Sequence, residues 1–198
     1  YQFVWFMAIP LCFVLFGIAP NFVPWFYGDG FERVVPSLRM LSFLIIAIGI
    51  NNVTGIQYFI PTKRQNLFTL TVAIGAAVNF ALNLVLIHFF QSVGAAIASV
   101  AAETVIALVQ IYIVRSELSP KKIFSTSWHY LIAGGMMLAI LEIISGVLTP
   151  CFAHTLMMMF VGVMVYIGTL LLMRDSFLLA NSKSLISKLT KVIKGREK

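Results

Sequence analysis

The stretch Gly55–Glu103, GIQYFIPTKRQNLFTLTVAIGAAVNFALNLVLIHFFQSVGAAIASVAAE, decides the fold. No Asp, Glu, Lys or Arg occurs in it between Arg64 and Glu103. A membrane-spanning helix needs roughly 20 apolar residues, so this run is too long for one span and suits two. The polar, flexible segment Gln91–Gly94 is where we expect the chain to reverse. The stretch therefore predicts a helical hairpin that crosses a bilayer twice.

Composition places the whole chain in the membrane class. Of its 198 residues, 60% are hydrophobic and 11% are charged, whereas soluble domains carry about 25% charged residues. Long continuous apolar blocks favour helices over a β-barrel. The net charge of +7 arises in loops and the tail, without a basic stripe between aromatics, so nucleic acid is not an expected partner. Two cysteines without CxxC spacing predict no metal site, and no motif predicts a cofactor.

The sequence predicts an all-α integral membrane protein with about six transmembrane helices in residues 1–173. The expected spans are residues 3–27, 37–60, 67–90, 93–114, 128–148 and 155–173, with a polar connector over 115–127. In the first span, Pro10 and Pro20 would kink a helix whose freed carbonyls must find partners on neighbouring helices. Alternatively, Pro20 ends this span and an interfacial turn follows. The chain begins without Met or a signal peptide, so we expect the C-terminal portion of a longer protein, or a truncated copy.

Basic residues alternate between the two ends of the predicted bundle. All but two of the 14 Lys and Arg follow the second, fourth or sixth span, and the two exceptions are Arg33 and Arg39. The positive-inside rule then predicts that both ends of the chain are cytoplasmic. In the tail, residues 174–198, apolar side chains share one helical face and lysines lie opposite, which predicts a basic amphipathic helix on the anionic inner leaflet. A solvated basic tail is the alternative. The apolar face would comprise Leu185, Ile186, Leu189, Val192 and Ile193.

Polar side chains inside the spans are the candidates for function, because lipid penalises them unless they have a partner. Glu103 lies near the middle of the fourth span, in one stripe with Ser99 and Gln110. We expect it either to line a cavity as a proton or cation site, and so to bind a coupling ion, or to be a neutral acid tied to a neighbouring helix. Asn79 and Asn83 are expected either to bind sugar hydroxyls or to join helices by hydrogen bonds.

Arg39 lies near the outer end of the second span. It could pair with a phosphate group of a ligand, or it could extend to the membrane interface. Glu142, in the fifth span, has the same two interpretations as Glu103. No Ser/His/Asp, Cys/His or paired-carboxylate arrangement occurs, so we expect no catalytic residues and no enzyme.

The hairpin and the residues around it resemble the C-terminal half of the polysaccharide flippases, the Wzx-type lipid-linked oligosaccharide flippases of the MOP superfamily. The similarity covers roughly residues 13–110. The motifs that carry it are Phe22–Phe31, Gly55-x-Gln57-x3-Pro61, Lys63-Arg64, Gly75-x3-Asn79-x3-Asn83 and Gly94-Ala95-Ala96-Ile97-Ala98-Ser99 followed by Glu103. The chain departs from the family at His88 and Gln91, where the family commonly has Pro and Gly.

This resemblance implies 12 to 14 helices in two bundles around a central cavity, with alternating access. The chain would be one part of a transporter that flips an undecaprenyl-diphosphate-linked oligosaccharide across the bacterial inner membrane, for polysaccharide biosynthesis. Its partners would be that lipid, the bilayer and the missing N-terminal half. Substrate candidates are then Arg39, Asn79, Asn83, Ser99 and Glu103. There are two alternatives: a related cation or drug antiporter, and a remnant without independent transport. A membrane polymerase or acyltransferase is not favoured, because it would need clustered catalytic groups.

Overall fold

The structure, a computed structural model, describes residues 1–125 and 127–179, and within these residues it is all-helical with no β-strand. In this described part of the chain, six segments are long and apolar enough to cross a membrane, which confirms the expected fold class of a multi-pass helical membrane protein. These segments are Gln2–Tyr27, Val34–Phe59, Gln65–Phe90, Ser92–Val114, Ile123–Val147 and Phe152–Leu172. The expected amphipathic face of the tail, residues 185–193, lies outside the described residues.

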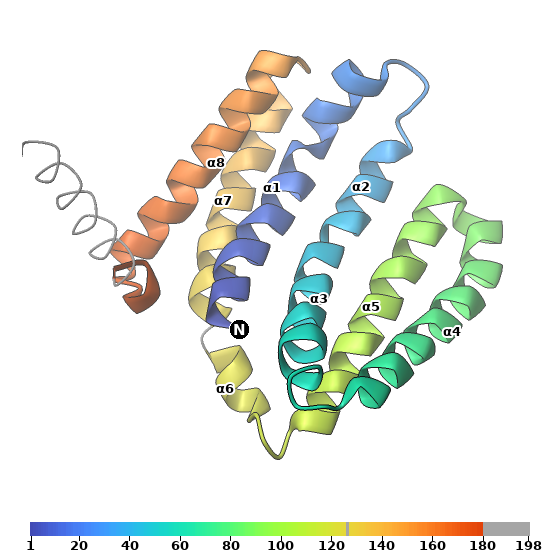
Figure 1. The fold of residues 1–198 in the computed structure, drawn as a ribbon. Coiled ribbons are helices and arrows are strands. Elements are labelled where there is room, and N and C mark those ends of the chain that lie inside the picture. The colour runs from blue at the N-terminus through green and yellow to red at the C-terminus, as the bar shows by residue number, and fades with distance from the viewer. Residues whose placement is uncertain (126, 180–198) are drawn as a thin grey trace, which may run out of the picture.

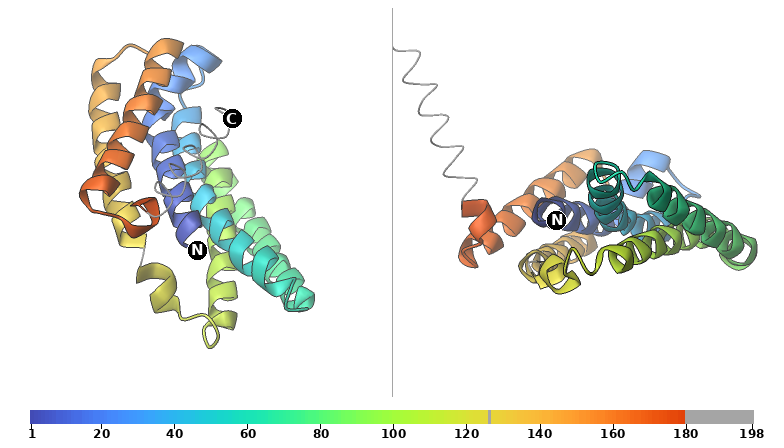
Figure 2. Two further views of the ribbon diagram at one scale, coloured as in Figure 1. Left: turned by 60° about the vertical axis from the view of Figure 1, so that its left-hand side comes forward. Right: turned by 60° about the horizontal axis from the view of Figure 1, so that its bottom comes forward.

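The helices stand side by side in a fan (Figure 1). Across the fan the order is α8, α7, α1, α2 continuing into α3, α5 and α4, and the views in Figure 2 show the same arrangement. The bounds are α1 Gln2–Tyr27, α2 Val34–Ser42, α3 Leu44–Asn51, the π-helix η1 Asn52–Phe59, α4 Gln65–Phe90, α5 Ser92–Val114, α6 Pro120–Ser125, α7 Ser127–Val147 and α8 Phe152–Leu172.

Successive spans run in opposite directions, so the loops divide between two ends of the fan. The N-terminus, the η1–α4 connection, the α5–α6 connection and the end of α8 lie at the lower end in Figure 1. The basic side chains of Lys63, Arg64, Arg115 and Arg174 belong to this end, whereas Arg33 belongs to the opposite end. The alternation of charge along the sequence therefore corresponds to an alternation in space.

Helix α1 is continuous through Pro10, Pro20 and Pro24, so the interfacial turn considered after Pro20 does not form. A proline lacks the N–H that would bind the carbonyl four residues earlier. For Pro10 and Pro20, neighbouring helices supply the missing donors. The Tyr166 hydroxyl donates to the Phe6 carbonyl at 3.0 Å, opposite Pro10, and Arg39 Nε donates to the Phe16 carbonyl at 3.2 Å, opposite Pro20. This confirms the expectation that partners on other helices make these prolines tolerable in lipid.

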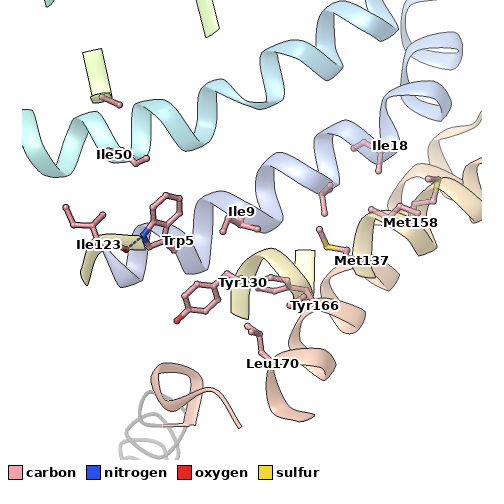
Figure 3. Packing of buried hydrophobic residues seen from close by; sticks show 14 of the residues in the cluster. Trp5, Ile9, Ile18, Ile50, Ile123, Tyr130, Met137, Met158, Tyr166 and Leu170 are labelled. Carbon is pink, nitrogen blue, oxygen red and sulfur yellow. Dashed lines mark hydrogen bonds between the residues drawn. The ribbon is translucent and has the colours of Figure 1, made fainter. Parts of the chain in front are cut away.

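The main core surrounds α1, where α7, α8, α2 and α3 all pack against it. Figure 3 shows Ile9, Met137 and Tyr166 among the side chains gathered there. In the most apolar part of α1, 44% of residues are buried within the protein, against 11% for α4. Helix α4 therefore lies at the edge of the fan, packed on α5 and η1, and many of its large apolar side chains are exposed.

The second span differs from the single helix expected over residues 37–60. It begins at Val34, because Pro36 falls in the first turn, where its missing N–H costs nothing. The α-helical pattern breaks at Phe43, and after Asn51 the chain widens into a π-helix that ends at Phe59. π-Helical turns are rare and occur frequently at functional sites.

The reversal between α4 and α5 takes one residue, Gln91, rather than the expected segment 91–94. Gln91 has φ +53°, a conformation that favours glycine. The helices touch just beyond it, since a Cβ on Gly94 would lie 2.1 Å from the main-chain oxygen of Leu86. The small residues Gly94, Ala98 and Ala102 are all buried, as expected of a close helix contact. The expected polar connector over 115–127 also contains a short helix, α6, which Pro120 begins.

Candidate functional site

Two hollows, joined side by side, form a groove between α3–η1, α4 and α5. The first hollow has a volume of about 250 Å³, and its polar lining residues are Asn51, Asn52, Glu103 and Gln110. The second has a volume of about 470 Å³, and its polar lining residues are Asn79, Ser99 and Glu103. Apolar side chains complete both walls, among them the shared residues Ile48, Val72 and Ile106. We call the two together the α3–α4–α5 groove.

Glu103 stands where the two hollows meet. It lies 11 residues into α5, about 16 Å along the axis and therefore near the middle of the span. Asn51, the last residue of α3, donates through Nδ2 to Glu103 Oε2 at 2.5 Å and to the Glu103 carbonyl at 3.2 Å. Glu103 is half-buried. It lines both hollows and is also bound to a neighbouring helix through Asn51. Lining a cavity and contacting a neighbouring helix are thus both observed, whereas a role for Glu103 in binding a coupling ion stays a prediction.

The π-helix η1 packs closely against α4 and α5 beside two residues that line the first hollow, Phe68 and Gln110. Gly55 is buried in η1, and a Cβ there would lie 2.6 Å from the ring of Phe68 on α4 and 3.2 Å from Nε2 of Gln110 on α5. Thr54 holds η1 from the other side, since its hydroxyl donates to the Ile50 carbonyl and lies 2.5 Å from the Tyr1 hydroxyl. A glycine at this position therefore lets η1, α4 and α5 meet closely enough to close one end of the first hollow.

Gln110 is fully buried at that end of the groove. Its Nε2 donates to the Thr71 hydroxyl of α4 at 3.1 Å, and the Thr71 hydroxyl donates to the Phe68 carbonyl at 2.8 Å. The predicted stripe of Ser99, Glu103 and Gln110 on α5 thus faces the groove along its length.

The two asparagines of α4 have different positions. Asn79 lines the second hollow and lies at the limit of hydrogen-bond distance from Ser99, with 3.5 Å from Nδ2 to Oγ. Asn83 donates through Nδ2 to Asn79 Oδ1 at 2.8 Å. Asn83 is not among the residues that line either hollow, so it orients Asn79. Gly75 lets α4 approach α5 closely near them, because a Cβ added at this position would lie 2.3 Å from the Ile106 side chain.

Arg39 lies away from the groove, between α2, α1 and α7. Its guanidinium is 2.5 Å from Glu142 Oε1 and 4.7 Å from the centre of the Phe16 ring, in addition to its bond to the Phe16 carbonyl. The structure therefore pairs two of the predicted functional residues with each other. An Arg that caps a carbonyl freed by proline and neutralises a carboxylate accounts for both charges inside the bundle.

At the basic end, an exposed ion pair joins the η1–α4 connection to the α5–α6 connection. Arg64 donates to Glu117 Oε1 at 2.6 Å, and the Tyr58 hydroxyl donates to Glu117 Oε2. These two hydrogen bonds hold the pKa of Glu117 below its usual value, and the bond from Arg64 has the larger effect. This clasp ties the end of η1 and the start of α4 to the segment that follows α5.

The groove has no arrangement that suggests covalent catalysis or a metal cluster. Among residues 1–125 and 127–179, no three His, Cys, Asp or Glu side chains come together as metal ligands. Glu103, Asn79 and Ser99 were predicted as site residues and lie together in the structure, whereas no role was predicted for Asn51. Two adjacent asparagines in an apolar span, Asn51 and Asn52, were the signal for it.

Comparison with protein families, with curated proteins and with solved structures found no match to this chain.

Proposed function

We propose that the chain is one part of a transporter that moves lipid-linked oligosaccharide across the bacterial inner membrane by alternating access, for polysaccharide biosynthesis. One observation carries the proposal: a groove lined by amides, a hydroxyl and a carboxylate lies near the middle of membrane-spanning helices. The resemblance of the hairpin to Wzx-type flippases of the MOP superfamily points the same way. The cargo would be an undecaprenyl-diphosphate-linked repeat unit.

The physical problem in such transport is a polar headgroup that must cross about 30 Å of hydrocarbon. Asn79, Ser99 and Glu103 offer replacements for the hydrogen bonds that sugar hydroxyls would lose with water. Their place near mid-depth suits a site that opens first to one side and then to the other. A missing N-terminal half would supply the opposite wall of the pathway, and the basic end of the fan would face the cytoplasm.

A cation or drug antiporter is the second candidate, and the charge distribution counts against it. Such a protein needs acidic groups along its cavity. In the part of the chain that the structure describes, Glu103 is the one carboxylate that lines the two hollows, since Glu142 is paired with Arg39 elsewhere. The groove is therefore better suited to hydroxyl-rich cargo than to strongly cationic compounds.

The test is a flipping assay on the protein as the native cell makes it, reconstituted in liposomes that contain lipid-linked oligosaccharide. A lectin or glycosidase added outside reports headgroups that appear there. We expect Asn79→Ala to slow flipping at least tenfold and Thr104→Val, on another face of α5, to leave it unchanged. Transport that survives Asn79→Ala and Glu103→Gln would remove the groove from the pathway, and efflux of cationic drugs instead of flipping would favour the antiporter.

A further inference from the structure

A third hollow, with a volume of about 350 Å³, lies between α1, α3, α5 and α6. Its lining residues include Trp5, Ile50, Leu108, Ile111 and Phe124, and we call it the α5–α6 hollow. None of its lining residues belongs to the α3–α4–α5 groove, so it is a separate cavity. Its volume falls in the range of roughly 300–1,000 Å³ that is typical of ligand pockets. Because Leu108 is 58% exposed and Phe124 is 43% exposed, the hollow is open at the surface of the bundle.

The lining of the α5–α6 hollow suits a hydrocarbon chain rather than a polar ligand. Two of its side chains carry a polar group, and each group already has a partner. Trp5 Nε1 donates to the Ile123 carbonyl at 2.9 Å (Figure 3), and the Thr104 hydroxyl donates to the Val100 carbonyl at 2.7 Å within α5. A sugar or an ion would lose its water there without gaining a hydrogen bond from a lining side chain. An acyl chain has no hydrogen bonds to lose.

The α5–α6 hollow extends along α5 toward the basic end of the fan. Its lining on α5 runs from Val100 to Ile111, which is about 16 Å along the helix axis. Val100 lies near the middle of the span, and Ile111 lies one turn before its end at Val114. This length is about half of the roughly 30 Å hydrocarbon core, that is, the depth of one leaflet. The hollow therefore matches an acyl chain whose headgroup is at the basic end.

Two basic side chains stand where the α5–α6 hollow ends. Arg115 follows the lining residue Ile111 by four positions, and Lys121 precedes the lining residue Phe124 by three. Residues at these spacings share one face of a helix, so both charges lie in line with the hollow. Both side chains are exposed. In residues 1–125 and 127–179 the ion pairs join other residues, so both positive charges are available to a ligand.

We propose that the α5–α6 hollow binds an anionic phospholipid of the leaflet at the basic end, with one acyl chain along α5 and the phosphate between Arg115 and Lys121. Basic pockets beside membrane helices on the cytoplasmic side suit anionic headgroups, which that leaflet supplies. The lipid would join α6 to α5 next to their connection. The proposal uses the expected cytoplasmic orientation of the basic end, and it does not rest on the proposed transport function.

Phosphatidylglycerol with a photoactivatable group in one acyl chain serves as the probe. The native full-length protein is placed in phosphatidylcholine nanodiscs that contain a trace of the probe, and crosslinked peptides are identified by mass spectrometry. We expect crosslinks to α5 and α3 at the hollow, which unlabelled phosphatidylglycerol prevents at least ten times more effectively than phosphatidylcholine. Leu108→Trp should fill the hollow and reduce these crosslinks at least fivefold. Leu84→Trp is the matched control, because Leu84 is 67% exposed on α4, and it should leave them unchanged.

The headgroup contact is tested with charge variants on the exposed surface. Each basic side chain near an anionic headgroup contributes roughly fivefold in affinity, so Arg115→Gln with Lys121→Gln should remove the preference for phosphatidylglycerol. Arg174→Gln, which removes a charge at the same end beyond α8, should retain it.

Three results would overturn the proposal. They are equal competition by both phospholipids, crosslinks that persist in Leu108→Trp, and displacement of the probe by undecaprenyl phosphate at lower concentration than by phosphatidylglycerol. The last result would assign the hollow to the lipid chain of the cargo. Because the nanodiscs contain no lipid-linked oligosaccharide, the result is independent of the flipping assay: a protein that does not flip lipid can still show this site, and a flippase can lack it.

Discussion

Replacing Tyr166 by Phe should destabilise the bundle only while Pro10 is present. The Tyr166 hydroxyl is buried and donates to the Phe6 carbonyl, which Pro10 deprives of its helical partner. Tyr166→Phe keeps the ring and removes one donor, so a buried carbonyl is left unpaired. Such a loss costs about 1–3 kcal/mol. In Pro10→Ala protein the new N–H can bind the Phe6 carbonyl, and the same change should then cost about 0.5 kcal/mol or less.

The assay is a double-mutant cycle of unfolding free energies in mixed detergent micelles, with the wild type, both single variants and the double variant. The difference between the two costs predicts a coupling energy of about 0.5–2.5 kcal/mol. Tyr112→Phe is the matched control, because Tyr112 is 65% exposed on α5, and it should change stability by less than about 0.5 kcal/mol. Strictly additive effects at Tyr166 and Pro10 would refute the explanation of how α1 tolerates its prolines.

Three further predictions concern the hairpin and the basic end. Gly94→Ala forces apart the main chains of α4 and α5 and should cost about 2–4 kcal/mol in unfolding measurements, whereas Gly135→Ala, with nothing within 4 Å, should be neutral or slightly stabilising. Gln91→Gly relieves the positive φ and should stabilise by about 0.5–1 kcal/mol, measured as a higher melting temperature. The pKa of Glu117 in the folded protein is depressed below its usual value of 4.5, so its pairing with Arg64 stabilises the fold above that pH. This stability is lost as the pH falls through the depressed pKa. Melting curves should therefore show a melting temperature that falls in acid, and Glu117→Gln should remove this pH dependence.

The positions of the six spans could be predicted because they depend on local properties of the chain. Hydrophobic length, charge alternation and terminating prolines act over one helix at a time. The tight approach at Gly94 was likewise visible as a row of small residues. These features are properties of segments, so the structure changes them by only a few residues.

Contacts between helices could not be predicted from such local properties of the sequence. Arg39 and Glu142 are 103 positions apart, and their pairing follows from the way α2 and α7 flank α1. The bond between Asn51 and Glu103 depends in the same way on where α3 ends and η1 begins. The predicted site residues were consequently divided: Glu103, Asn79 and Ser99 share the groove, while Arg39 takes part in a separate cluster.

A transport pathway through the α3–α4–α5 groove requires that the groove admit water within the membrane. Cysteine accessibility tests this directly, in native-length protein whose Cys12 and Cys151 have been replaced. Ser99→Cys lines the groove, whereas Phe80→Cys lies on the open face of α4, where Phe80 is 68% exposed. If the groove is hydrated, a hydrophilic, membrane-impermeant thiol reagent will label position 99 at least ten times faster than position 80. Equal, slow labelling at both positions would mean that lipid or protein fills the groove, and would contradict the account.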